Sequence, residues 1–126
     1  MIRTHKPEGL PCGIYIVRLT NELPKAISTG STVKVNRDNL KVGLFKNSSL
    51  QRYVNYYVTF RGCAEMDVIY ETISEDEVKA LEKAILKELK KYRIPGKKGA
   101  ITEWLEGISY DEVHNIIVNT INTLED

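Results

Sequence analysis

The sequence has few of the residues that build disulfide or zinc sites, and it lacks a long apolar run. Its 126 residues include two cysteines, Cys12 and Cys63, and two histidines, none at zinc-site spacing. We therefore expect buried thiols rather than a disulfide scaffold. No apolar run approaches the roughly 20 residues that span a bilayer, so we expect no membrane association. Motifs of the P-loop, HExxH and GxSxG types are also missing.

The composition is that of one globular domain. With 42% hydrophobic and 28% charged residues in 14.4 kDa, the chain can build a single core, and we predict one domain over residues 1–126. Residues 1–11 are expected to form an N-terminal tail. Arg3, Lys6 and Glu8 stand there where a signal peptide would be apolar, so we expect a cytoplasmic protein.

The net charge of +1 conceals an asymmetry between the two halves of the chain. Residues 1–62 hold ten Lys or Arg against three Asp or Glu, whereas residues 63–126 hold eight against fourteen. The basic half could therefore face a polyanion such as a nucleic acid. Alternatively, the two signs of charge mix on the folded surface, and the sequence leaves both arrangements open.

The pattern of β-rich segments and helix-capping residues predicts an α+β fold. Strands are expected over residues 14–19, 40–45 and 66–73. Residues 21–38 are expected to form an inserted loop with a small hairpin at 33–35. Capping-box patterns begin at Ser48, Ser74 and Ser109, and they predict helices over 49–57, over 74–92 and after 109. We predict a small, mainly antiparallel three-stranded sheet flanked by these helices.

The first predicted helix has two chemically different sides. At 100° per residue, one side holds apolar and aromatic residues, and we expect it to face the core: Leu50, Tyr53, Val54 and Tyr57. Arg52 and Tyr56 lie one turn apart on the other side. An arginine and a tyrosine would thus be presented together, away from the core.

The second predicted helix has an acidic residue within its apolar stripe. The stripe consists of Val78, Leu81, Ile85, Leu86, Leu89 and Tyr92. Glu82 lies four residues after Val78 and three before Ile85, so its carboxylate points toward the packed side. Such a carboxylate loses hydration, and a bound cation would compensate the loss. Alternatively, Glu82 lies at the edge of the stripe and reaches water or an arginine.

Five sequence elements resemble, in order, those of the GIY-YIG nuclease superfamily. They are Gly13-Ile14-Tyr15, Lys41-Val42-Gly43, Arg52 with Tyr56, Glu82, and Glu103-Trp104. The chain is most similar to the branch with KIG in place of YIG, an LEK helix and a C-terminal Glu-Trp pair. The corresponding segments here are KVGLFKNSSLQR, ALEKAILKEL and TEWLEGISYDEV, and the resemblance spans residues 12–122.

This resemblance implies metal-dependent hydrolysis of phosphodiester bonds. Glu82 corresponds to the glutamate that binds Mg²⁺ (or Mn²⁺) beside the scissile phosphate. Tyr15 would hydrogen-bond the attacking water or act as its general base, and Tyr56 would orient the water or the phosphate. Arg52 would bind the phosphate. Lys41 would lower the pKa of Tyr15 or contact phosphate.

The resemblance predicts a DNA endonuclease of the restriction-like or phage and mobile-element type, with RNA as an open alternative substrate. Leu44 and the long 21–38 insert depart from the family pattern. Relatives commonly have a small, polar or basic residue in place of Leu44, and Lys46 is the nearby basic residue that could substitute for it. The second hypothesis is therefore a catalytically degenerate nucleic-acid or protein-binding module. For the endonuclease, the specificity for a DNA sequence would come from loops 21–38 and 94–100 or from a homodimer, or it would be weak.

Overall fold

The computed structural model describes residues 11–20, 27–28, 34–47, 49–60, 62–96 and 101–125. The elements follow in the order β1 (Cys12–Leu19), β2 (Ile27–Ser28), β3 (Lys34–Val35), β4 (Leu40–Lys46), α1 (Ser49–Thr59), β5 (Ala64–Thr72), α2 (Glu75–Glu88), the 3-10 helix η2 (Lys90–Tyr92), β6 (Arg93–Pro95), β7 (Ile101–Leu105) and α3 (Tyr110–Glu125). The predicted α+β class is confirmed. No helix in these described ranges is long and apolar enough to cross a membrane.

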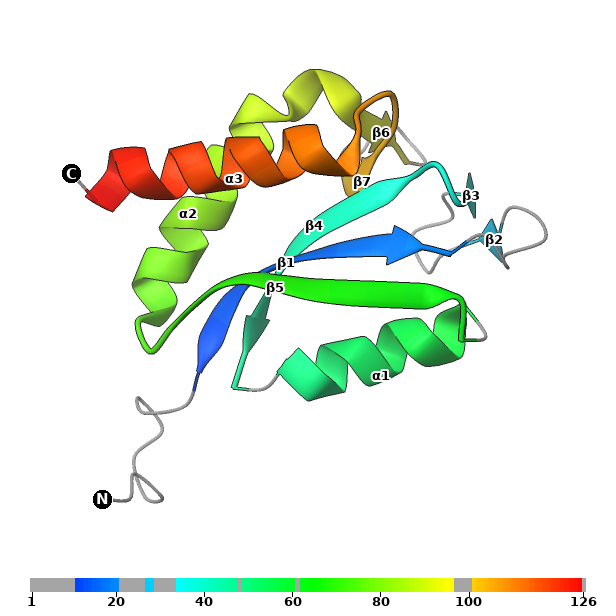
Figure 1. Ribbon diagram of the computed structural model, residues 1–126, viewed down its shortest axis with the longest axis horizontal. Helices are drawn as coiled ribbons and strands as arrows, with labels where there is room; N and C mark the ends of the chain where they lie inside the picture. The colour runs from blue at the N-terminus through cyan, green and yellow to red at the C-terminus, as the bar shows by residue number, and fades with distance from the viewer. Residues whose placement is uncertain are drawn as a thin grey trace.

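The main sheet has five antiparallel strands in the order β5-β1-β4-β7-β6 (Figure 1). The three longest strands, β1, β4 and β5, match the predicted ones within two residues at each end, but the predicted count of three is wrong. The two added strands are short, and β7 pairs with β4 only at Leu40↔Leu105 and Lys41↔Trp104. Such brief pairing leaves no alternating pattern in the sequence. The expected loop 94–100 thus begins inside β6, and residues 97–100 lie outside the described part of the chain.

A second, two-stranded sheet lies in the inserted segment. Ile27 pairs with Val35, and Ser28 pairs with Lys34, so a small hairpin is present but its strands are residues 27–28 and 34–35 rather than 33–35. Val35 is fully buried against the aromatic core described below. The insert is therefore anchored to the domain, whereas residues 21–26 and 29–33 of the predicted loop lie outside the described residues.

The strand β1 separates two hydrophobic cores. Ile14 and Ile16 face a core shared with α2 and α3, while Tyr15 and Val17 face an aromatic core that includes Phe45, Phe60 and Trp104. Figure 1 shows α2 and α3 on one side of the sheet and α1 on the other. Residues of β1 are thus buried on both faces, as its apolar run predicts.

The second predicted helix packs as its pattern indicates. Five residues of the apolar stripe predicted for this helix are buried: Val78, Leu81, Ile85, Leu86 and Leu89. The Ser74 hydroxyl accepts a hydrogen bond from the Glu77 amide at 3.2 Å, which supplies the predicted N-cap. The helix ends earlier than predicted, because η2 tightens its last turn. Cys12 is buried and Cys63 half-buried, and no disulfide links them.

The orientation predicted for α1 is wrong. Leu50, Val54 and Tyr57 are 65%, 43% and 50% exposed, whereas Tyr56 is half-buried and packs against the aromatic core. Phe60, four residues after Tyr56 and therefore on the same side of the helix, is buried and anchors that side to the sheet. Phe60 lies beyond the predicted range of 49–57, so the pattern within that range lacks the residue that determines the orientation. The Ser48 cap lies outside the described residues.

Candidate functional site

Two glycines create the space that an aromatic ring on the neighbouring strand occupies. In the β1–β4 register, Gly13 lies opposite Phe45 and Tyr15 lies opposite Gly43. A Cβ at Gly43 would lie 2.5 Å from Tyr15 Oη and 2.6 Å from its Cζ. At Gly13 it would lie 2.0 Å from the carbonyl oxygen of Tyr70 and 2.8 Å from the Phe45 ring. The glycines of both motifs thus leave room for aromatic rings. Gly43 leaves the room that the Tyr15 ring occupies.

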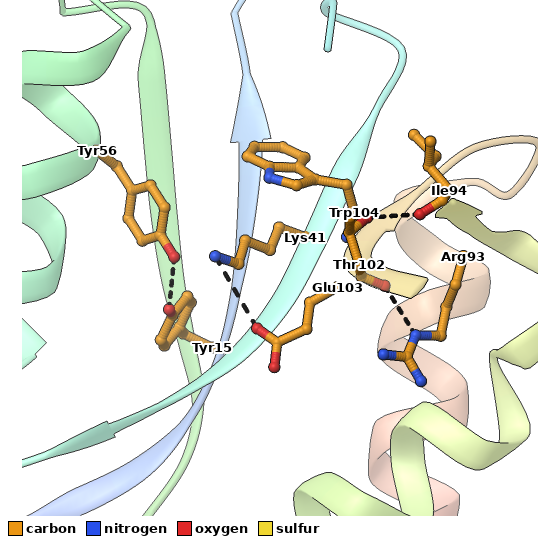
Figure 2. Close-up of polar contacts among 8 residues, drawn as sticks. All are labelled: Tyr15, Lys41, Tyr56, Arg93, Ile94, Thr102, Glu103 and Trp104. Atoms are coloured by element: carbon orange, nitrogen blue, oxygen red, sulfur yellow. Dashed lines mark hydrogen bonds and ion pairs between the residues drawn. The ribbon is translucent and has the colours of Figure 1, made fainter. Parts of the chain in front are cut away.

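The Tyr15 phenol lies at the boundary between core and solvent and is held by Tyr56. The two hydroxyl oxygens are 2.7 Å apart, and the rings meet edge to face at 5.8 Å (Figure 2). Burial, and then the neighbouring Tyr56, raise the pKa of Tyr15 well above its ordinary value, while Arg52 opposes the rise. Tyr15 is therefore a neutral phenol at physiological pH, suited to hydrogen bonding.

Lys41 occupies a polar gap between aromatic rings. Its ammonium nitrogen lies 5.1 Å from the centroid of the Tyr56 ring, 5.9 Å from that of Trp104, and 3.9 Å from a carboxylate oxygen of Glu103 (Figure 2). Trp104 itself is buried and belongs to the aromatic core. The rings and Glu103 hold the Lys41 charge next to the two tyrosines.

Glu82 lies half-buried on α2, beside a second carboxylate. Burial, followed by the charge and hydrogen bond of Glu103, raises the pKa of Glu82 to about 7, and Lys41 and Arg93 oppose the rise. Glu103 extends from β7, next to Trp104 (Figure 2). Glu82 is therefore half-buried and lies within the influence of Arg93 and Lys41, and its acidic neighbour Glu103 was part of neither expected alternative.

Four of the five predicted site residues line one open pocket of about 310 Å³. The lining residues are Tyr15, Lys41, Leu44, Lys46, Arg52, Lys79, Glu82 and Glu103. Tyr56, the fifth, joins the site through its hydrogen bond to Tyr15. Of the remaining lining residues, Leu44 is the departure from the family pattern and Lys46 the basic residue expected to substitute for it. Glu103 had only its place in the Glu-Trp pair as a signal, and Lys79 had none.

The pocket lies where β7 stops pairing with β4. The β4–β7 pairing includes Lys41 but no later residue of β4, so the following part of this strand forms an open edge within the described structure. Side chains from both faces of the sheet can meet around such an edge. Glu82 approaches from the side of α2, and Arg52 approaches from α1 on the other side.

Charges of the two halves of the chain meet at ion pairs. Arg18 pairs with Glu65 at 3.0 Å, Lys41 with Glu103 at 3.9 Å, and Lys46 with Glu75 at 3.5 Å. Each pair joins a base of the first half to an acid of the second. The described residues thus favour mixing of charge over a separate basic face, although the pocket itself keeps a cationic lining.

The fold and pocket define a small α+β domain with a cation-lined pocket that contains paired carboxylates. Residues 14–121 match the T5orf172 domain. The chain therefore belongs to the T5orf172 domain family, a phage-associated group of endonuclease-related domains. Membership makes it a nuclease-like or DNA-binding module. No significant match was found among curated proteins or solved structures.

The raised pKa of Glu82 predicts a pH dependence of stability. The folded protein holds this proton up to about pH 7, whereas the unfolded chain releases it near its ordinary pKa of 4.5. The folded state therefore binds more protons between these values, and stability falls as the pH rises through them, by at most about 3 kcal/mol from this group. Denaturant unfolding in a metal chelator at pH 5 and pH 8 measures the change. Glu82→Gln should remove the contribution of Glu82 to this change. If the stability of the wild type and of the variant depends on pH to the same extent, the raised pKa of Glu82 is contradicted.

Proposed function

We propose that the protein is a metal-dependent DNA endonuclease of the GIY-YIG type that hydrolyses phosphodiester bonds. The observation that carries this proposal is the convergence of Tyr15, Lys41, Arg52 and Glu82 on one pocket, from different elements and both sides of the sheet. A basic and acidic set of this kind can bind a phosphate and support attack on it. The family match supports the same class of activity.

The donor atoms in the pocket fit a hard divalent cation. Glu82 would hold Mg²⁺ or Mn²⁺, with the Glu103 carboxylate as a second oxygen donor lining the same pocket. Within the described residues, no three acidic, histidine or cysteine side chains are arranged so that they could hold a metal ion together. Mg²⁺ commonly takes one or two protein carboxylates and completes its shell with water and substrate phosphate, so two are sufficient. When bound, the cation would offset charge at the phosphate and assist the leaving oxygen.

The chain's own residues would orient the reactants. Arg52 is exposed on α1, so its planar guanidinium can bind two phosphate oxygens. The Tyr15 hydroxyl would hydrogen-bond the attacking water, and Tyr56 would keep that hydroxyl in position. Lys41, fixed among the rings and Glu103, would add positive charge near the phosphate.

The proposal is tested by nicking of supercoiled plasmid with purified protein. Conversion to nicked or linear DNA in millimolar Mg²⁺ or Mn²⁺, and its loss in a chelator, is the expected result. A parallel assay with structured RNA decides between the two nucleic acids. Cleavage that persists in the chelator would contradict the role of the metal. If no substrate is cleaved with either metal, the proposal that the protein is an enzyme is contradicted.

One observation favours the second candidate, a DNA-binding module that does not cut. Leu44, which departs from the family pattern, lines the pocket and adds apolar surface next to the phosphate-binding residues. For such a module, a gel-shift assay would show salt-sensitive DNA binding that is unchanged in Glu82→Ala and gives no products. A homodimer stays a prediction, which sedimentation equilibrium can check.

A further inference from the structure

Two lysines at the pocket have no part in the proposed chemistry. Lys46 ends β4 and Lys79 lies in the first part of α2, and both line the pocket. Their ammonium groups lie 3.5 and 3.3 Å from the same carboxylate oxygen of Glu75. Both side chains are about half exposed, at 44% and 52%. One acidic residue on the surface thus gathers two cations from different elements at one side of the pocket.

The cations at the pocket fall into two groups, one at the proposed reaction centre and one beside it. Four lining residues are cationic (Lys41, Lys46, Arg52 and Lys79), and two are acidic. Lys41 is paired with Glu103, and Arg52 is the residue exposed to receive the scissile phosphate. Glu75 can neutralise only one of the two remaining lysines, so one positive charge is left without compensation at this position.

We propose that Lys46 and Lys79 bind the phosphate next to the scissile one, so that the site takes a polynucleotide strand rather than a lone phosphodiester. The inference rests on the proposed function. Consecutive phosphates of a strand carry one negative charge each, and flexible lysines are suited to bind such a point charge without fixed geometry. Glu75 holds the two ammonium groups together and competes with the phosphate for them.

Salt-dependent DNA binding in a chelator tests the inference without requiring cleavage. We expect Lys46→Ala and Lys79→Ala each to weaken binding by about threefold to tenfold and to lower the slope of log affinity against log salt by about 1. Glu75→Gln should strengthen binding, because it removes the competitor. The control is Lys87→Ala, which removes an exposed lysine of the same helix that lines a different groove, between α2 and α3. The inference would be overturned if Lys46→Ala and Lys79→Ala had the same salt slope as Lys87→Ala. It would also be overturned if Glu75→Gln bound DNA more weakly than the wild type.

Cleavage of a small substrate separates this inference from the proposed function. Bis(p-nitrophenyl) phosphate has one phosphodiester and no neighbouring phosphate. Its hydrolysis should be unchanged in Lys46→Ala and Lys79→Ala, whereas the KM for DNA increases. Equal loss on both substrates would assign the lysines to the reaction centre and overturn the inference. If the wild-type protein cleaves neither substrate, the proposed function fails, while the salt slopes still decide whether the two lysines bind DNA phosphates.

Discussion

Replacing Glu82 with Gln is expected to reduce metal-dependent nicking by about a thousandfold or more. Glutamine keeps the shape of the side chain but removes the charge that would hold the cation, so positioning of the remaining residues cannot compensate. The rate of conversion of supercoiled plasmid at saturating Mg²⁺ measures the effect. A variant that cuts at the wild-type rate would remove Glu82 from the site.

The same substitution should not unfold the protein. Glu82 faces Glu103 in a half-buried position, and a neutral amide removes the repulsion between these groups. We therefore expect Glu82→Gln to be at least as stable as the wild type at pH 8, so that its inactivity cannot be attributed to misfolding. Glu88→Gln is the matched control, because it removes an exposed carboxylate of the same helix that lines the groove between α2 and α3. This control should keep full activity.

The second large effect is expected for Gly43→Ala. Its Cβ would meet Tyr15 Oη at 2.5 Å, and the buried ring would have to move away from β4. We expect a cost of about 2–4 kcal/mol in the free energy of unfolding, from overpacking and from the weakened hydrogen bond to Tyr56. Nicking should also decrease, because the hydroxyl that would orient water is displaced. Denaturant unfolding and the plasmid assay measure the two effects.

Two comparisons identify the clash as the cause. In a Tyr15→Leu background the same Gly43→Ala change should cost much less, because the shorter side chain leaves the space over Gly43 empty. Gly107→Ala provides the second comparison. Gly107 has a φ of +76° and no atom within 4 Å of an added Cβ, so only backbone strain of about 1 kcal/mol is expected there. An identical cost of Gly43→Ala in both backgrounds would show that Tyr15 is not the obstacle.

The sequence by itself determined the local elements and the identities of most site residues. The apolar run of β1 predicts a strand buried on both faces, and the period of α2 predicts its buried stripe, because each pattern records contacts made along one element. The break in that stripe also indicated Glu82. The order of the motifs predicted that Tyr15, Lys41 and Arg52 act together, and the structure places them in one pocket.

Only the tertiary structure decided how these elements meet. The side of α1 that packs depends on Phe60, beyond the predicted helix, and on the bond from Tyr56 to Tyr15, two residues 41 positions apart. The place of Glu103 beside Glu82 depends on β7 pairing briefly with β4, which leaves no periodic pattern in the chain. A pocket at the open edge of a strand combines residues from both faces of the sheet. Contacts of this kind join distant segments, and a local pattern of hydrophobicity contains no information about them.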